Sequence, residues 1–259
     1  MINFKIFSDY IWPFCYIGKG IVDQLKKEYV INDKWVSFEL HPETPHAGML
    51  LSERFRGYDL SSFYDQLRAR GKEVGVVFGN LTVLSNSRLA LMASEYARDL
   101  GRYDSFHQNI FHAYFTEGLD IGNLKVIANV AKKSGLDEKE TLSAIRDGRY
   151  ASRLNETRKE ATLIGLTGVP LFLIENKYKI VGAQPIETFR DLLDKIKSRV
   201  WNPKASCGVL YPPLCGIVQL TNSAALRFRN WSFTNERIQT SFSSRIILVP
   251  YFIKKRIDI

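Results

Sequence analysis

The sequence has few cysteines, with three among 259 residues at Cys15, Cys207 and Cys215. An odd number is not typical of a disulfide framework and suits a reducing compartment better. Cys207 and Cys215 lack metal-ligand spacing, and the four histidines form no H-x-x-x-H pair. Zinc sites need such clusters of ligands. We therefore expect neither a disulfide-stabilised scaffold nor a metal site.

Long apolar runs are also missing. The longest fall short of the ~18 residues that a membrane helix needs, and the N-terminus lacks the basic and apolar segments of a signal peptide. No Walker loop, G-x-G-x-x-G or G-x-S-x-G motif occurs, so neither nucleotide binding nor a serine-hydrolase elbow is indicated. We expect a cytoplasmic protein with no membrane partner and no bound cofactor.

The net charge of +9 is unevenly distributed. Residues 200–259 hold eight basic and two acidic residues, a net of +6, whereas residues 1–199 hold 28 basic and 25 acidic residues, a net of +3. Nucleic-acid binding requires a basic face on a folded domain. Because the body of the chain is nearly balanced, we expect no nucleic-acid partner.

The sequence does contain a β-α-β pattern at its start. Residues 2–8 alternate apolar and polar side chains, residues 13–30 have apolar side chains at helical spacing, and residues 34–40 alternate again. Pro13 suits the first turn of the helix. Such a unit closes by a right-handed crossover into a parallel pair of strands.

The middle of the chain is helical almost throughout, over residues 61–164. Asn86 or Ser87 is a candidate N-cap, and Gly101 and Gly118 are candidate helix ends. Helices of this length joined by short polar turns predict a compact bundle.

The strand pattern then returns in VPLFLIEN and KYKIVGAQ, joined near Asn176, before an amphipathic helix over residues 185–200. The order β-α-β, helical segment, β-β-α predicts an α/β, thioredoxin-like fold with an all-helical insertion. We assign the thioredoxin-like domain to residues 1–60 and 165–199, and the insertion to residues 61–164.

Residues 200–259 form an atypical C-terminal tail without a clear helical period. Three interpretations are open: an ordered appendage, a partner-binding tail, or translated sequence that selection has not shaped. The composition favours the last.

The stretch SDYIWPFCYIGKG raises the question of chemistry. A cysteine in the first turn of a helix is stabilised as thiolate, with a pKa of ~3.5–7.5 at such sites. However, Cys15 stands at the second position of a Cys-x-x-Cys, normally the shielded one. It is therefore either a buried, inert thiol or an active one. Trp12 stands at the first position, where indole cannot attack a disulfide. It either covers the start of the helix or forms an apolar wall for a ligand.

A second landmark is Gly168-Val169-Pro170, directly before a strand. In thioredoxin-like folds the proline at this place is cis and faces the Cys-x-x-Cys helix. The backbone of the residue before it then pairs with an extended substrate. The Gly18-Lys19-Gly20 segment lies inside the first predicted helix and indicates close packing rather than a phosphate-binding loop.

The stretches SDYIWPFCYIGK, FELHPETP, SNSRLALMASEYA, FHAYFTEGLDIGN and GVPLFLIENKYKIVGAQ together carry a family resemblance. Residues 1–199 resemble the DsbA-like thiol–disulfide oxidoreductases of the FrnE type. These are related to 2-hydroxychromene-2-carboxylate isomerases and kappa-class glutathione transferases. The resemblance implies a site between the Cys-x-x-Cys helix and the cis-proline loop, with Pro13, Phe14, Cys15, Val169 and Pro170 carried over.

The resemblance implies exchange of thiols and disulfides with peptides or small thiols, with glutathione as a candidate substrate, and it is compatible with a homodimer. Trp12 departs from the family pattern and removes the nucleophile, so we expect two-thiol activity to be impaired. Whether the chain is an enzyme stays open. The alternatives are a glutathione-dependent isomerase or transferase, and a peptide-binding member without enzymatic activity.

Overall fold

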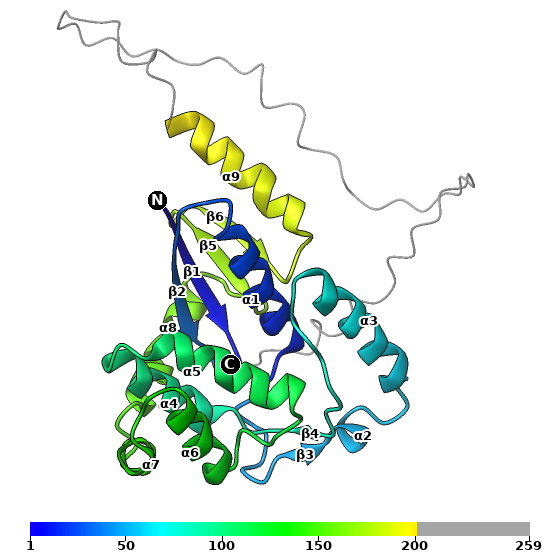
Figure 1. Cartoon of the computed structure of the whole chain (residues 1–259), viewed down its shortest axis with the longest axis vertical. Helices are drawn as coiled ribbons and strands as arrows, with labels where there is room; N and C mark the ends of the chain where they lie inside the picture. The colour runs from blue at the N-terminus through cyan, green and yellow to red at the C-terminus, as the bar shows by residue number, and fades with distance from the viewer. Residues whose placement is uncertain (201–259) are drawn as a thin grey trace, which may run out of the picture. The chain divides into compact units, whose positions relative to one another are not determined.

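A computed structural model describes residues 1–200, and the tail predicted over residues 200–259 lies outside them apart from its first residue (Figure 1). A four-stranded mixed sheet has the order β2-β1-β5-β6. Its strands are β1 (Ile2–Ser8), β2 (Ile31–Ser37), β5 (Leu171–Ile174) and β6 (Tyr178–Val181). β1 and β2 are parallel, and β5 pairs antiparallel with both β1 and β6. This arrangement confirms the predicted thioredoxin-like α/β fold.

Helix α1 (Pro13–Leu25) connects the parallel strands, as the β-α-β pattern predicts. Gly18 and Gly20 let α1 approach its neighbours closely. A Cβ on Gly18 would lie 3.0 Å from Phe172 Cζ and 3.2 Å from Pro170 Cγ, and one on Gly20 would lie 2.7 Å from the Val74 carbonyl oxygen. These distances confirm that the two glycines serve close packing.

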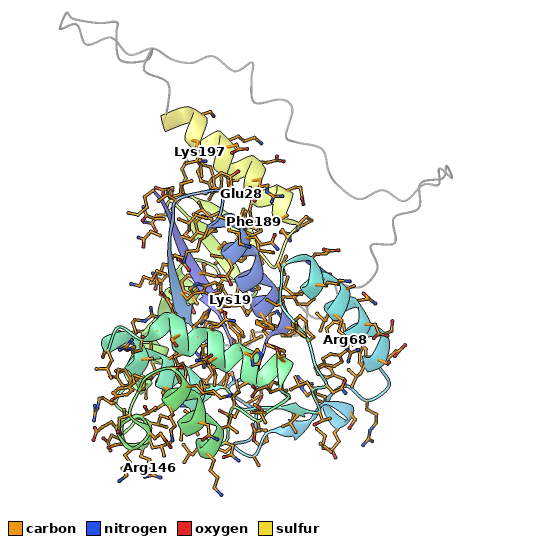
Figure 2. The ribbon with its side chains drawn as sticks, viewed as in Figure 1. Lys19, Glu28, Arg68, Arg146, Phe189 and Lys197 are labelled. Carbon is orange, nitrogen blue, oxygen red and sulfur yellow. The ribbon has the colours of Figure 1, made fainter. Side chains whose placement is uncertain are left out.

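Helix α9 (Ile186–Val200) follows β6, one residue later than predicted. It buries Phe189 and Leu193 completely. Figure 2 labels Phe189 on α9. The Phe189 ring meets Phe172 of β5 edge to face at 4.9 Å between centroids, an arrangement that aromatic pairs prefer. This contact anchors the helix to the sheet strand that follows the Val169–Pro170 loop.

Between β2 and β5 the chain forms mostly helices, drawn from cyan to green in Figure 1. They are α2 (Leu51–Arg54), α3 (Leu60–Glu73), α4 (Arg88–Asp99), α5 (Tyr103–Phe111), the π-helix η1 (His112–Thr116), α6 (Leu124–Lys133), α7 (Glu138–Arg146) and α8 (Ala151–Leu163). A short pair of strands, β3 (Met49–Leu50) and β4 (Val83–Leu84), accompanies them. Two-residue strands are too short to show a period in the sequence, so they were not predicted.

The helix ends follow the local chemistry. Gly101 and Gly118 have positive φ values of 66° and 71°, which confirms them as helix-ending residues. Ser87 occupies the N-cap position of α4 without a capping bond from its side chain. Instead, the Arg88 amide donates to Asn86 Oδ1 at 3.0 Å. Within the described residues, no helix is both long and apolar enough to cross a membrane.

Candidate functional site

The predicted site begins at the first residues of α1. Trp12 is the N-cap residue, with an extended backbone (φ −97°, ψ 115°), and Pro13 opens the helix. The Trp12 carbonyl accepts the first bond of the turn from the Cys15 amide at 2.9 Å. Pro13 fits this position because the first amides of a helix have no intrahelical partner. The sequence therefore places Trp12 at the edge of the helix start, half-buried, and Cys15 one turn inside.

Cys15 is completely buried, and its thiol is free. Burial raises the pKa of this thiol to about 12, and the polar groups of Ser8 and Asp9 offset only part of that rise. A thiol without a nearby cation in an apolar environment stays protonated at neutral pH. Of the two interpretations left open by the sequence, these observations favour the shielded, unreactive thiol.

Asp9 is a neighbour that the sequence analysis did not single out. Its carboxylate accepts hydrogen bonds from the amides of Leu40 at 2.7 Å and Ile11 at 3.4 Å. The side chain is fully buried, which raises its pKa to about 6 even though these amides act to lower it. An acidic residue directly after a buried strand was the available signal in the sequence. Asp9 ties the end of β1 to the segment after β2 and so fixes the start of α1.

The second predicted landmark lies against α1. The Val169–Pro170 peptide bond is cis, as expected. The Pro170 ring lies against Gly18, and the Pro170 carbonyl accepts from the Gly182 amide at 2.8 Å. Within residues 1–200, the Val169 backbone makes no hydrogen bond, although its side chain is buried. The fold therefore packs the Val169–Pro170 loop against helix α1, which carries Cys15 in its first turn.

Two residues of the helical insertion complete the site, and sequence reasoning did not find them. The Phe14 ring lies 5.9 Å from Trp12 and 6.5 Å from Phe63 of α3, measured between centroids. The Arg70 guanidinium, also from α3, lies 5.5 Å from the Phe14 ring centre. It donates a hydrogen bond to the Ala183 carbonyl, in the loop after β6. All of these side chains except Ala183 are half-buried, so they form an aromatic and cationic border beside the start of α1.

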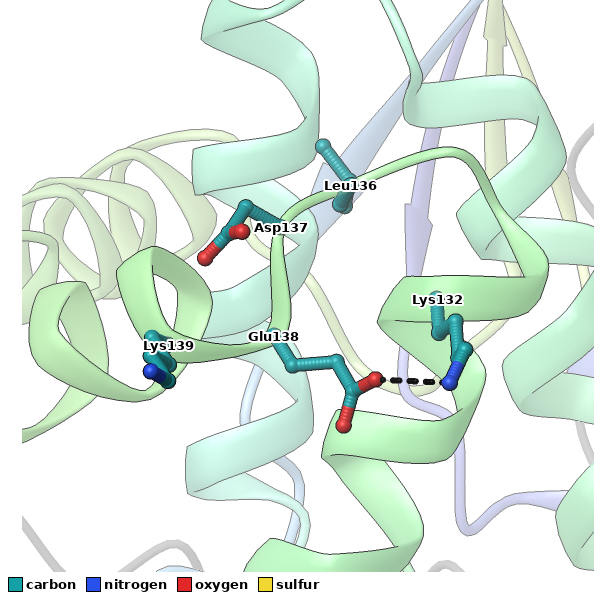
Figure 3. A pocket seen from close by; sticks show the side chains of 5 residues that line it. All are labelled: Lys132, Leu136, Asp137, Glu138 and Lys139. Atoms are coloured by element: carbon teal, nitrogen blue, oxygen red, sulfur yellow. Dashed lines mark ion pairs between the residues drawn. The ribbon is translucent and has the colours of Figure 1, made fainter.

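A surface pocket lies elsewhere, at the turn between α6 and α7 (Figure 3). It is lined by Lys132, Leu136, Asp137, Glu138 and Lys139. Three of its polar side chains already have partners, because Lys132 and Glu138 form an ion pair at 3.2 Å and Asp137 accepts from the Glu140 amide at 2.9 Å. None of its lining residues belongs to the site around α1. No group of three His, Cys, Asp or Glu side chains able to hold a metal ion occurs in the described part of the chain.

Comparison with known proteins supports the thioredoxin-like fold described above. The DSBA-like thioredoxin domain matches residues 4–194. The structure is also similar to that of the probable DsbA oxidoreductase SCO1869 from Streptomyces coelicolor, with a TM-score of 0.69 and 22% identity. That likeness covers 83% of this chain and 97% of the other.

Two further solved structures share the fold at lower identity. A 2-hydroxychromene-2-carboxylate isomerase has a TM-score of 0.60 and 16% identity, over 80% of this chain and all of the other. The cytosolic disulfide reductase DsbM from Pseudomonas aeruginosa with GSH has a TM-score of 0.54 and 16% identity, over 76% of this chain and 99% of the other.

Proposed function

Because the chain belongs to the DSBA-like thioredoxin domain family, we propose that it binds peptides or small thiols such as glutathione at the Val169–Pro170 loop without exchanging disulfides through two thiols. The observation that carries the proposal is that Cys15 is buried and has its pKa raised to about 12, while the N-cap residue of α1, where the family resemblance expects the nucleophile, is Trp12. The family to which the chain belongs comprises DsbA-like thiol–disulfide oxidoreductases, so the proposal separates ligand binding from the redox step.

The proposed loss of two-thiol chemistry follows from the absence of a side chain at this site that can attack a disulfide. Thiol–disulfide exchange begins with a thiolate, and indole cannot replace it. Because burial raises its pKa to about 12, Cys15 stays protonated at pH 7. The buried sulfur is also out of reach of a bulky disulfide.

Binding has separate support. The Val169 amide and carbonyl make no hydrogen bond within residues 1–200, so they are free to pair with an extended backbone. Trp12, Phe14 and Phe63 supply aromatic surface next to the start of α1. A fold relative, DsbM, is described with GSH, a small thiol peptide. A ligand of this chemical kind fits a site that offers main-chain pairing and ring contacts.

Calorimetric titration tests the binding. Two probes that cannot exchange disulfides are used: S-methylglutathione, and an uncharged tetrapeptide that is acetylated and amidated. We expect at least one to bind with one-to-one stoichiometry. Gly18→Val should abolish that binding, because the new side chain would meet Phe172 and the Pro170 ring. Leu163→Ala is the control, since Leu163 is 88% exposed at the end of α8. Absence of binding for both probes would refute the proposal.

Insulin reduction by dithiothreitol tests the loss of redox activity. We expect the natural chain to be inactive and Trp12→Cys to be active. In the variant the introduced thiolate attacks the insulin disulfide, the Cys15 thiol displaces the reduced insulin chain, and dithiothreitol reduces the resulting disulfide. If the natural chain were active and Cys15→Ser kept that activity, a group other than Cys15 would be responsible for the reduction of insulin. A folded but inactive Trp12→Cys would contradict the assignment of the nucleophile position.

A further inference from the structure

Arg70 is a cation that lacks an acidic partner within the described residues. Its guanidinium donates to the Ala183 carbonyl and lies over the Phe14 ring, and it takes part in no ion pair of residues 1–200. Arg68, two residues earlier on α3, differs clearly. It pairs with Asp65 at 2.8 Å and donates to Asn80 Oδ1 at 2.9 Å. A guanidinium has five N–H donors, so Arg70 keeps several for a ligand.

The position of Arg70 relates it to the peptide site. Ala183 follows Gly182, whose amide donates to the Pro170 carbonyl at 2.8 Å. Phe14 is two residues from Trp12, and their rings lie 5.9 Å apart. Arg70 therefore stands where the loop beside Pro170 and the start of α1 come together. It reaches this place from the insertion, with its side chain half-buried.

From this placement, and on the premise of the proposed function, we propose that Arg70 determines specificity by binding a carboxylate of the peptide ligand. The planar guanidinium matches a carboxylate with two parallel hydrogen bonds. The aromatic rings beside it lower the local water content, which strengthens the pair relative to one in open solvent. The preferred ligand is thus a short peptide whose free carboxylate lies near the segment paired with Val169.

Four probes show which of the two carboxylates of glutathione Arg70 binds. They are S-methylglutathione, its form amidated at the glycine carboxylate, its form amidated at the γ-glutamyl α-carboxylate, and the uncharged tetrapeptide. Each is titrated into the natural chain, Arg70→Gln, Arg70→Lys and the matched control Arg68→Gln (Figure 2 labels Arg68 on α3). Melting temperatures of all variants show that they are folded.

We expect Arg70→Gln to weaken S-methylglutathione about tenfold or more, as loss of a charge-assisted pair does, and Arg68→Gln to leave it unchanged. Arg70→Lys should lose part of that affinity, because the lysine ammonium keeps the positive charge but cannot form the two parallel hydrogen bonds of a guanidinium. One of the two amidated forms lacks the carboxylate that Arg70 binds. We expect the affinity of the natural chain for that form to be as low as the affinity of Arg70→Gln for S-methylglutathione. Raising the salt concentration should weaken binding to the natural chain and leave Arg70→Gln almost unaffected.

Equal affinity of the natural chain and Arg70→Gln for S-methylglutathione would overturn the assignment while leaving peptide binding intact. An equal loss for the uncharged tetrapeptide would also overturn it, because Arg70 would then only position Phe14 and the loop. If no probe binds the natural chain, the proposed function fails first, and the assignment of Arg70 fails with it.

Discussion

The sheet and the helical insertion each bury a titratable side chain, and the two differ in what surrounds it. Asp9, at the end of β1, is held by backbone amides such as that of Leu40, and burial raises its pKa to about 6. His107, in α5, lies among rings, with its Nδ1 3.1 Å from the Tyr10 hydroxyl and 3.2 Å from that of Tyr103. Burial lowers the pKa of His107 well below its usual value. The buried Asp9 therefore stays uncharged at pH values below about 6, whereas the buried His107 stays uncharged down to pH values well below the usual pKa of histidine.

The comparison separates the proposed ligand site from a region of close packing. Around α1 the rings of Trp12, Phe14 and Phe63 are half-buried and Arg70 has donors to spare. Around His107 most of the rings are buried, and Tyr103 is the half-buried exception. Phe111, for example, is fully buried and meets the rings of several neighbours: Tyr10, Tyr16, His107 and Phe115. Substitutions should therefore cost stability in the insertion and function at α1.

The largest expected effect is that of Phe111→Ala. Removing this fully buried ring leaves a cavity among four aromatic neighbours, and such changes cost about 3–5 kcal/mol. Urea unfolding followed by circular dichroism measures the loss. The conservative Phe111→Leu, which fills most of the space, should lose clearly less. A cost below about 1 kcal/mol for Phe111→Ala would show that the insertion is not packed as described.

Asp9→Asn should change the pH dependence of stability. In the folded chain Asp9 keeps its proton up to about pH 6, whereas an unfolded aspartate releases it near pH 3.8. The folded state thus holds the extra proton between these values, and stability falls as pH rises from about 4 to 6. The shift corresponds to about 3 kcal/mol.

Because His107 acts in the opposite direction over this range, the measured quantity is the difference between the two proteins. The free energy of unfolding of the natural chain should fall relative to that of Asp9→Asn as the pH rises from 4 to 7. The control is Asp137→Asn, which changes an exposed capping aspartate on α7. Identical pH profiles for the natural chain and Asp9→Asn would mean that Asp9 is solvated in the folded protein.

His107 should act in the opposite sense. Its folded pKa is lowered by burial, with smaller contributions from the positive charges of Lys19 and Arg98. The unfolded histidine takes up a proton below about pH 6.5 and the folded one does not, so stability falls as pH drops, with a limiting slope of about 1.4 kcal/mol per pH unit. His107→Gln, which keeps an acceptor for the tyrosine hydroxyls, should flatten this acid limb.

The Asp9 and His107 effects partly cancel in the natural chain between pH 4 and 6. The double variant tests whether the two regions are independent, because distant sites should give additive changes. If His107→Gln left the acid limb unchanged, the histidine would be protonated or exposed in the folded state.

The smallest effect on stability is expected for Trp12→Ala. The ring is half-buried at the edge of the site, so we expect a cost of about 1 kcal/mol or less. Binding of the uncharged tetrapeptide should nevertheless weaken, because ring contact with the ligand is lost. Thermal melts and calorimetry on the same sample measure both. A large loss of stability with unchanged binding would reassign Trp12 from the ligand surface to the core.

Much of the fold follows from periodicity and turn residues. Alternation predicted β1 and β2, although it placed β2 at residues 34–40 instead of Ile31–Ser37, and two short apolar segments predicted β5 and β6. Helical spacing predicted α1, α9 and most of the insertion. The Val169–Pro170 loop and the Trp12–Cys15 turn were found because each is a short local motif. These parts depend on neighbours in the sequence, which is why reading the sequence alone locates them.

The rest depends on contacts between distant parts of the chain. Phe63 and Arg70 reach Phe14 and Ala183 only because α3 packs beside α1, and no spacing in the sequence encodes that approach. The burial of Asp9 likewise follows from the segment around Leu40 closing over the end of β1. Long-range packing of this kind is what pattern analysis of a single sequence leaves out.

The bond from Arg70 to the Ala183 carbonyl has a consequence for how the protein can diversify. The sheet, the Val169–Pro170 loop and the start of α1 come from the two parts of the sequence that flank α3 (Leu60–Glu73), which is itself one contiguous segment. Exchanging this single helix between family members would swap the ligand-facing border and leave the sheet unchanged. Chimeras with an exchanged α3 therefore offer a direct way to engineer new selectivity on this scaffold.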